Sequence, residues 1–402
     1  MMVENLIWGY VYPNEAEIQW SVLIVLYPYI TGLVAGAFIA SSLYHVFGKK
    51  EIKPVARFAL LTALSFLLVA TMPLLTHLGH PERGIEIMFT PHLTSAMSGF
   101  GYIYSFYLIV VVLEIWLSFR EDIVKTALNS QGWKKLLYSG LALFSYDISE
   151  KALHEDEKLA KKLAIIGIPS AAFLHGYVGF IFGGIKANPW WSTPLMPLIF
   201  LMSAIVSGIA LLILLYIASM KLRKRAIDHK CLHSLAHYLW IFLILDVALE
   251  LLEIVSMKYE SLEDIEIINR LLSDKIAFTF YGVQLTLGIL IPFILLLLVG
   301  IMKNRETLKM IMISVSSIFV VIGVFAMRWN VVIGGQEISK SLSGTLTYEP
   351  VFFSQEGVLP AIIILAIPFV ILVVVTRILP PWKDMEEEVP ESKPKSTIKH
   401  LY

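Results

Sequence analysis

Apolar runs long enough to cross a membrane recur along this whole chain. A membrane has about 30 Å of hydrocarbon, and a helix that rises 1.5 Å per residue crosses it with about 20 residues. The composition agrees, since 57% of the 402 residues are hydrophobic and only 16% are charged. The sequence therefore predicts an all-α integral membrane protein. Nine spans are expected, at residues 18–47, 55–78, 97–119, 163–186, 193–219, 232–257, 276–301, 308–333 and 357–379.

Lysines and arginines gather in alternate connections between these spans. If the N-terminus lies outside, 25 of the 32 basic residues fall in segments that would face the cytoplasm. The positive-inside rule therefore selects an external N-terminus, a cytoplasmic C-terminus and an odd number of spans. Residues 1–17 then form an external segment, 120–162 a cytoplasmic connection and 383–402 a cytoplasmic tail. Within that connection, residues 133–149 have the pattern of an amphipathic helix on the inner surface.

The spans divide into two groups of four and one extra span. We expect a first four-helix bundle at residues 18–186, a second at 193–333 and an additional transmembrane helix at 357–379. Small residues on the first and fourth spans, among them Gly36 and Gly179, would let membrane helices approach closely.

Two polar aromatic side chains lie within the fourth span, His175 and Tyr177. At membrane depth, a polar head needs a protein group, a water or a ligand as its partner, and a quinone head group is one such ligand. The two side chains are about 200° apart around the helix, so they are not expected to share one ligand. Tyr27, in the first span, is expected at the depth of Tyr177, roughly 12 to 14 Å below the outer face.

Three carboxylates share one face of the sixth span. Asp246, Glu250 and Glu253 are spaced i, i+4 and i+7, from about mid-membrane to the outer boundary. Ionised groups at that depth are costly unless they are paired, protonated or wetted. One interpretation is a path for protons. The other is a structural ion pair with Arg328, which lies well inside a span, because arginine and carboxylate pair readily.

The single cysteine, Cys231, limits the redox chemistry of the chain. A disulfide framework, a cysteine-ligated zinc site and an iron–sulfur cluster each need several thiolates. We therefore expect no iron–sulfur cluster in this chain, and any redox metal belongs elsewhere. The formal net charge of zero argues against nucleic acid as a partner.

Five short motifs occur in order along residues 20–380. They are YPYITGLVAGAF at 27–38, LGHPER at 78–83, TSAMSG at 94–99, the hairpin from GYVGF to WSTPLMP at 176–197, and RWNVVIGGQ at 328–336. Together they resemble the NrfD/PsrC family of polysulfide-reductase-type membrane subunits. The last motif is similar to one in the longer NrfD-like subunits of sulfite-reduction-associated transmembrane complexes. The chain departs from the family at His80, where arginine is more frequent, and at Tyr27, where some members have histidine.

The resemblance implies a membrane subunit without a redox centre of its own. Such a subunit oxidises or reduces a membrane quinone, for instance menaquinone, and docks an iron–sulfur partner on the outer face, here expected in sulfur-compound metabolism in the cell membrane. It makes Tyr177 the first choice for a quinone contact, ahead of Tyr27. The histidines near the outer ends of the second and third spans would exchange protons between quinone and water. These histidines are His77, His80 and His92.

Other interpretations of the same residues remain open. Tyr27 and Tyr177 would then only pack in the bundle without binding a ligand. The three histidines would be ordinary residues of the membrane interface. Trp190 and Trp191 are expected to be interfacial anchors. A b-type cytochrome would need axial histidines on facing helices, for which His45 with His233 or His237 is the available pairing. A secondary transporter is the third class, because prolines interrupt several spans.

Overall fold

The computed structural model describes residues 7–15, 17–92, 94–259 and 265–382. The predicted cytoplasmic tail at 383–402, and residues 1–6 and 16 of the predicted external segment, lie outside the described residues. The elements, in chain order, are β1 (Trp8–Gly9), η1 (Pro13–Glu15), α1 (Val22–His45), η2 (Lys50–Ile52), α2 (Lys53–Leu67), α3 (Met72–His77), η3 (Pro81–Met88), α4 (Ala96–Asn129), α5 (Gly132–Leu141), α6 (Glu150–Gly183), α7 (Met196–Leu222), α8 (His229–Tyr259), α9 (Ile265–Arg270), η4 (Leu271–Lys275), η5 (Phe278–Leu290), α10 (Ile291–Ile301), α11 (Glu306–Trp329), η6 (Asn330–Gly334), α12 (Gly335–Glu337), β2 (Gly344–Thr345) and α13 (Val358–Ile378).

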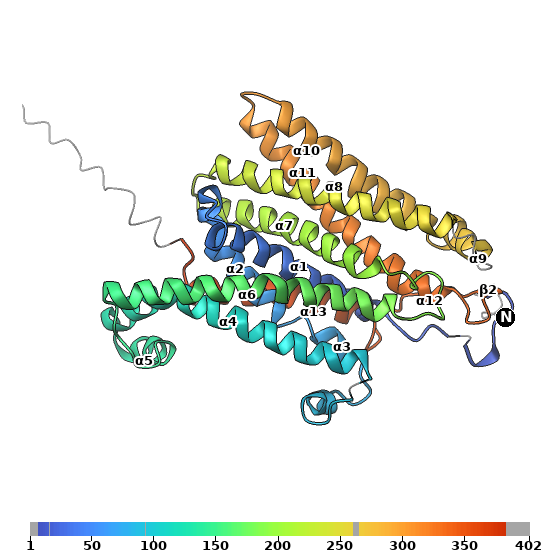
Figure 1. Cartoon of the computed structure of the whole chain (residues 1–402), viewed down its shortest axis with the longest axis horizontal. Helices are drawn as coiled ribbons and strands as arrows, with labels where there is room; N and C mark the ends of the chain where they lie inside the picture. The colour runs from blue at the N-terminus through green and yellow to red at the C-terminus, as the bar shows by residue number, and fades with distance from the viewer. Residues whose placement is uncertain (1–6, 16, 93, 260–264, 383–402) are drawn as a thin grey trace, which may run out of the picture.

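The long helices run between the same two ends of the molecule (Figure 1). Eight of them, within the described residues, are long and apolar enough to cross a membrane, which confirms an all-α integral membrane protein. The sixth predicted span coincides with α8, which is outside that set of eight and runs beside α7 and α10. The number of spans, their orientation and the division into two bundles stay predictions. We call the end that carries β1 and β2 the N-terminal end, and the end beside α5 the opposite end (Figure 1).

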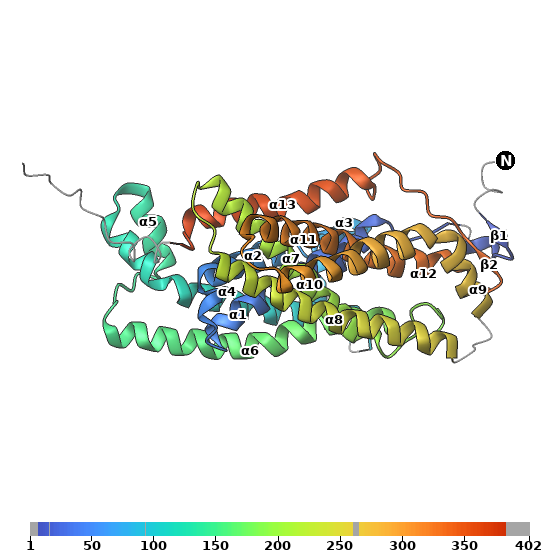
Figure 2. The same cartoon turned by 90° about the horizontal axis from the view of Figure 1, so that it is seen from above.

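Helix α1 lies at the centre of the bundle because it is apolar on almost every face. It packs against α2, α6, α7 and α11, and nearly all of its side chains are buried. Ser21 caps its first turn, where its hydroxyl accepts a hydrogen bond from the backbone N–H of Leu23. Figure 2 shows α13 on one side of the bundle and α6 and α8 on the opposite side.

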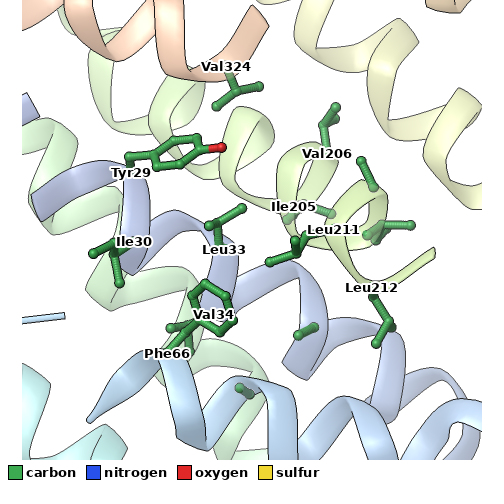
Figure 3. Packing of buried hydrophobic residues seen from close by; sticks show 14 of the residues in the cluster. Tyr29, Ile30, Leu33, Val34, Phe66, Ile205, Val206, Leu211, Leu212 and Val324 are labelled. Atoms are coloured by element: carbon green, nitrogen blue, oxygen red, sulfur yellow. The ribbon is translucent and has the colours of Figure 1, made fainter. Parts of the chain in front are cut away.

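Helices α1 and α7 approach each other closely in this core. A Cβ added at Gly36 would lie 2.5 Å from the carbonyl oxygen of Ile205, and one added at Gly208 would lie 2.6 Å from Gly36 Cα. The two backbones therefore touch, as small residues allow in membrane helices. Around this crossing, Leu33 of α1 lies toward Ile205 and Leu211 of α7, whereas Val34 lies beside Phe66 of α2 (Figure 3).

Large apolar side chains are exposed on the outermost helices. Examples are Phe106 and Ile109 on α4, Phe173 on α6, and Val370 and Val373 on α13. In water, such a surface would be unusually apolar, whereas in lipid it is the expected exterior of a membrane bundle. Burial and exposure therefore agree with α1 as the innermost helix.

The predicted connection at 120–162 is largely helical in the structure. Helices α4 and α6, each of 34 residues, extend past the predicted spans. Arg120 and Asp156, 2.5 Å apart, join these two extensions. The amphipathic helix predicted at 133–149 is shorter than expected, because α5 ends at Leu141 and stands beside the bundle (Figure 1).

At the N-terminal end, the chain before α1 is tied to the segment before α13. β1 pairs antiparallel with β2, with Trp8 opposite Thr345. The side chain of Gln336 accepts a hydrogen bond from the backbone N–H of Trp20, at 2.8 Å. These contacts hold the start of the first span in place.

Candidate functional site

Tyr27 is buried in α1 at the level of the first turns of α4. Only 2% of its surface is exposed, and its ring meets Phe100 of α4 edge-on, with ring centroids 5.2 Å apart. Its hydroxyl has no hydrogen-bond partner among the described residues. An unpartnered hydroxyl in an apolar interior is costly, so this group is suited to a ligand or a water.

Tyr177 approaches the same turn of α4 from α6. A Cβ added at Gly99 would lie 2.3 Å from the Tyr177 hydroxyl oxygen, so this hydroxyl rests on the glycine. The ring is half-buried and lies beside Phe173 and Phe180, with centroid distances of 5.9 and 5.5 Å. No hydrogen bond to the Tyr177 hydroxyl is formed within the described residues. Tyr27 and Tyr177, which the fold brings together on Gly99–Phe100 and within electrostatic reach of each other, are called the tyrosine pair below.

His175 points away from the tyrosine pair, into the contact between α6 and α1. Its Nδ1 lies 2.8 Å from the carbonyl oxygen of Ala171, and its Nε2 lies 2.5 Å from that of Thr31. Because a carbonyl only accepts, a neutral imidazole satisfies one of the two contacts and an imidazolium satisfies both. His175 therefore joins α6 to α1 and has no ring nitrogen left for a further partner.

The three predicted proton-exchanging histidines lie at the N-terminal end but do not contact the tyrosine pair. His77 Nδ1 is 2.7 Å from a carboxylate oxygen of Glu356, which links α3 to the segment before α13. His80 is exposed and lies 3.0 Å from Glu82. His92 is exposed beside Thr94, at 2.9 Å.

The three carboxylates of α8 are all buried and face the neighbouring helices. Glu253 accepts a hydrogen bond of 2.7 Å from the Thr193 hydroxyl. Glu250 accepts one of 3.1 Å from the Gln284 amide. Asp246 is 2% exposed, and its Oδ1 has no partner among the described residues.

A line of hydrogen bonds continues from Glu250 into the neighbouring helices. The Gln284 carbonyl oxygen accepts from the Asn330 amide at 2.8 Å, and the Asn330 oxygen accepts from the Thr279 hydroxyl at 2.6 Å. Gln284 and Thr279 belong to η5 and Asn330 to η6, and both segments are π-helices. π-helical turns are rare and are frequent at functional sites. Here they present the amides toward the carboxylates of α8.

Several of these polar groups line two neighbouring cavities, and we refer to the two cavities together as the acidic cavity. The one nearer the N-terminal end has an empty volume of about 500 Å³, and its lining includes Trp190, Glu250, Glu253, Gln284 and Asn330 with several methionines and isoleucines. The deeper one is much narrower and is lined by Asp246, Glu250 and Gln284 among apolar residues. Glu250 and Gln284 line both, so they stand between the two spaces.

Arg328 does not form the ion pair that the sequence offered as an alternative. Within the described residues, no ion pair joins it to Asp246, Glu250 or Glu253. Its guanidinium donates to the Ser203 hydroxyl at 2.8 Å and to the Phe200 carbonyl at 3.2 Å. It also lies over the Phe200 ring, 3.9 Å from the centroid. The charge is thus held by neutral groups of α7, within electrostatic reach of the carboxylates.

Arg328 and His175 meet between the tyrosine pair and the acidic cavity. Both line a narrow space with Thr31 and Gly32 of α1 and Phe200 of α7. Polar side chains, those of His175 and Arg328, therefore lie among the apolar ones that line this space.

Trp190 and Trp191 are buried, and the prediction of interfacial anchors is wrong for them. Their indole N–H groups donate to the backbone carbonyls of Asn330 and Val331, at 2.9 and 2.6 Å. Asn188, in the same turn, donates to the carbonyl of Gly335 at 2.7 Å. The hairpin turn thus satisfies carbonyls at η6, where the backbone departs from the α-helical pattern.

Sequence reasoning missed the neutral polar groups around the carboxylates of α8. Gln284 lies in the seventh predicted span and Asn330 within the last family motif, while Thr193 begins the fifth span. A carboxamide inside an apolar run is itself an available signal, because it needs hydrogen-bond partners. The sequence did not show that these helices face α8.

Comparison with known proteins places this architecture among membrane redox subunits. The profile of the family described as polysulphide reductase, NrfD matches residues 11–339. A selenate reductase subunit of Mesobacillus selenatarsenatis is 32% identical over 321 residues, which are 78% of this chain and 73% of that protein. Protein NrfD of Escherichia coli is 25% identical over 225 residues, covering 55% of this chain and 65% of that protein.

A further relative is the Hdr-like menaquinol oxidoreductase integral membrane subunit of Archaeoglobus fulgidus. It is 22% identical over 220 residues, which are 55% of this chain and 47% of that protein. The family match covers most of the chain, including the helices that carry the tyrosine pair and the acidic cavity. This chain therefore belongs to the polysulphide reductase NrfD family, as its motifs indicated.

Proposed function

We propose that this chain is the quinone-reactive membrane subunit of a multisubunit oxidoreductase in the cell membrane. It exchanges electrons between a membrane quinone, with menaquinone the expected one, and an iron–sulfur partner subunit docked at the N-terminal end, which faces outward. Membership of the NrfD family supports this proposal. So do the names of two relatives, a menaquinol oxidoreductase subunit and a selenate reductase subunit.

The observation that carries the proposal is the tyrosine pair. Two tyrosine hydroxyls, those of Tyr27 and Tyr177, lie at one level of the bundle, and neither has a partner within the described residues. A tyrosine hydroxyl is a neutral donor, and a quinone carbonyl is a neutral acceptor of matching geometry. The aromatic neighbours Phe100, Phe173 and Phe180 provide an apolar wall for a flat ring. The residues present therefore fit a quinone head group.

Each residue of this region has a distinct part in the proposal. A quinone supplies two-electron, two-proton chemistry when it is bound. Tyr177 donates the hydrogen bond that orients the head group, and Tyr27 offers the second donor. His175 fixes α6 on α1 through the Thr31 carbonyl, which sets the position of Tyr177 two residues on. His77, His80 and His92 exchange protons with water at the N-terminal end.

The acidic cavity supports the handling of protons. Asp246, Glu250 and Glu253 are buried carboxylates along one face of α8, and Glu250 lines both of its spaces. In the proposal these groups hold and pass protons, while Arg328 provides a fixed positive charge nearby. The hydrogen bonds from Gln284 and Thr193 keep two of the carboxylates in position.

The terminal substrate belongs to sulfur-compound metabolism in this proposal. The support is the family description, polysulphide reductase, together with the resemblance of residues 328–336 to the longer NrfD-like subunits. The substrate itself would be bound by a catalytic partner and not by this chain.

Isolation of the intact complex from native membranes tests the proposal. We expect an iron–sulfur subunit to co-purify and a quinone to be extractable from the complex. Added quinol should transfer electrons to the iron–sulfur clusters, which the spectrum of the reduced clusters would show. Recovery of the chain in native membranes without any redox partner, together with no reaction with a quinol, would overturn it.

Reporter fusions test the orientation. A reporter after Tyr402 is expected in the cytoplasm and one before Glu4 outside, because of the distribution of basic residues. If both ends report the same side, the nine-span prediction and the outward docking face are wrong.

A further inference from the structure

A separate cavity lies at the opposite end of the molecule, where α4, α5 and the end of α13 meet. Its empty volume is about 600 Å³. The polar residues that line it include Asp122, Lys134, Tyr138 and Arg377, and the apolar ones are Ile123, Ile378, Leu379 and Pro380. We call this space the basic cavity.

Two hydrogen bonds hold α5 in place beside the basic cavity. The Tyr138 hydroxyl donates to the carbonyl of Ile378, at 2.7 Å. The Trp116 indole donates to the carbonyl of Leu141, at 2.8 Å. The first bond ties α5 to the end of α13 and the second ties it to α4. Lys134 of α5 and Arg377 of α13 therefore line one cavity whose walls are fixed.

The net charge of the lining is positive. The carboxylate of Asp122 forms an ion pair with Arg57, whose guanidinium also lies over the Phe119 ring. That pair compensates the negative charge internally. Lys134 and Arg377 form no ion pair or hydrogen bond within the described part of the chain, and both are exposed. Among the described residues, two positive charges without an ion-pair partner thus line the basic cavity.

The surroundings of the basic cavity are apolar and lie at the ends of membrane helices. Val373 and Val374 of α13 lie about one turn from Arg377 toward the membrane, and each is exposed by about half of its surface (52 and 50%). Trp133 and Leu136 of α5 are exposed as well. A ligand that used all of these surfaces would have an anionic head and apolar tails. A free inorganic anion would use only the two charges.

We propose that the basic cavity binds the phosphate of an anionic phospholipid, with the acyl chains along the exposed face of α13. Basic pockets between membrane helices at the headgroup level recognise anionic lipids in this way. Lys134 and Arg377 supply the charge, and Trp133 lies at the level of the headgroups. This site is independent of the quinone proposal, because none of its residues belongs to the tyrosine pair or the acidic cavity.

Native mass spectrometry of the full-length protein, exchanged into equal amounts of phosphatidylglycerol and phosphatidylcholine, tests the proposal. We expect the wild type to retain phosphatidylglycerol preferentially. Lys134→Gln and Arg377→Gln are each expected to lower this retention about fivefold, and the double variant about 25-fold, because one basic residue contributes about that factor near an anionic surface. Lys134→Arg and Arg377→Lys keep the charge and should keep the preference.

The matched control is Lys161→Gln with Lys162→Gln, two exposed lysines of α6 that are outside the basic cavity. This control should bind as the wild type does. Equal losses in the control would overturn the proposal, since they would show a general charge effect. So would full retention by the double variant. Displacement of the lipid by millimolar inorganic phosphate would assign the site to a free anion, and so would contradict a phospholipid site.

Discussion

The tyrosine pair and the acidic cavity differ in both chemistry and construction. The tyrosine pair offers two neutral hydroxyls on regular helices, against a glycine and a ring of aromatic side chains. The acidic cavity offers carboxylates and carboxamides, it encloses measurable space, and two of the helices around it are π-helical where they meet it. A neutral aromatic surface suits a quinone head group, whereas ionisable groups beside space that can hold water suit protons.

The two regions share a frame. α1 carries Tyr27 and also packs against α7, while Arg328 and His175 lie in the narrow space between the regions. The comparison therefore predicts that variants in the packing of α1 against α7 disturb both regions alike. Variants within one region should disturb only its own function.

The largest effect is expected at the crossing of α1 and α7. Gly208→Ala places a Cβ 2.6 Å from the Gly36 backbone, so the helices must move apart, at a cost of roughly 1–3 kcal/mol for overpacking. We expect a lower yield of folded protein and a lower melting temperature by size-exclusion thermal assay. Gly176→Ala is the matched control, because the nearest atom to its added Cβ is 3.8 Å away. Equal stability of the two variants would show that the close contact of α1 and α7 does not stabilise the fold.

The next effect is expected at Tyr177. Tyr177→Phe keeps the ring and deletes the hydroxyl, so stability should change by about 1 kcal/mol at most. Quinone-coupled turnover of the intact complex should fall by roughly tenfold or more, since each 1.4 kcal/mol of lost orientation is a factor of ten. Phe182→Leu, on the same helix but packed against Phe200 and Trp191 and not against Tyr177, is the control for packing alone. If the Tyr177→Phe complex turned over at the wild-type rate, the Tyr177 hydroxyl would not be a quinone contact.

A smaller and different effect is expected at Asp246. Asn keeps the shape of the side chain but cannot exchange a proton. Asp246→Asn should therefore reduce the proton uptake that accompanies turnover. The change in turnover rate across about three pH units should be several-fold smaller in the variant than in the wild type. Stopped-flow measurement with a pH-sensitive dye checks this. Normal proton uptake in this variant would show that Asp246 has a structural role and does not transfer protons.

The smallest effect is expected at Gly99. Gly99→Ala places a Cβ 2.3 Å from the Tyr177 hydroxyl oxygen, and the flexible tyrosine ring must shift. We expect normal folding and a KM for quinol raised about threefold, which corresponds to a small loss of orientation. Gly101→Ala, on the same helix turn, meets only the Ile87 side chain at 3.3 Å and should leave the KM unchanged.

The sequence predicted the fold through its composition and the length of its apolar runs. Each predicted span coincides with a helix or a pair of consecutive helices, because an apolar run in lipid has helix as its main solution. The ends of α4 and α6 were not predictable, since their polar extensions are helical through contacts such as Arg120–Asp156. The burial of Trp190 and Trp191 depends on which helix the hairpin meets, and no local pattern encodes that.

The site was predictable to a different extent in each region. The family motifs singled out Tyr177 and Tyr27, and helical spacing singled out Asp246, Glu250 and Glu253. The hydrogen-bond partners of Glu250 and Glu253 lie on other helices, at Gln284 and Thr193, so only the tertiary structure shows them. The interpretation of Arg328 as an ion-pair partner failed because serine and carbonyl groups of α7 reach its guanidinium first.

The most direct test of the division between the two regions is the affinity of the intact complex for a quinone, measured for two variants side by side. Titration of a quinone analogue by equilibrium binding would compare Tyr177→Phe and Asp246→Asn with the wild type. The account predicts a Kd raised about tenfold in Tyr177→Phe and unchanged in Asp246→Asn. Unchanged affinity in Tyr177→Phe together with lost binding in Asp246→Asn would contradict it, and would place the quinone in the acidic cavity.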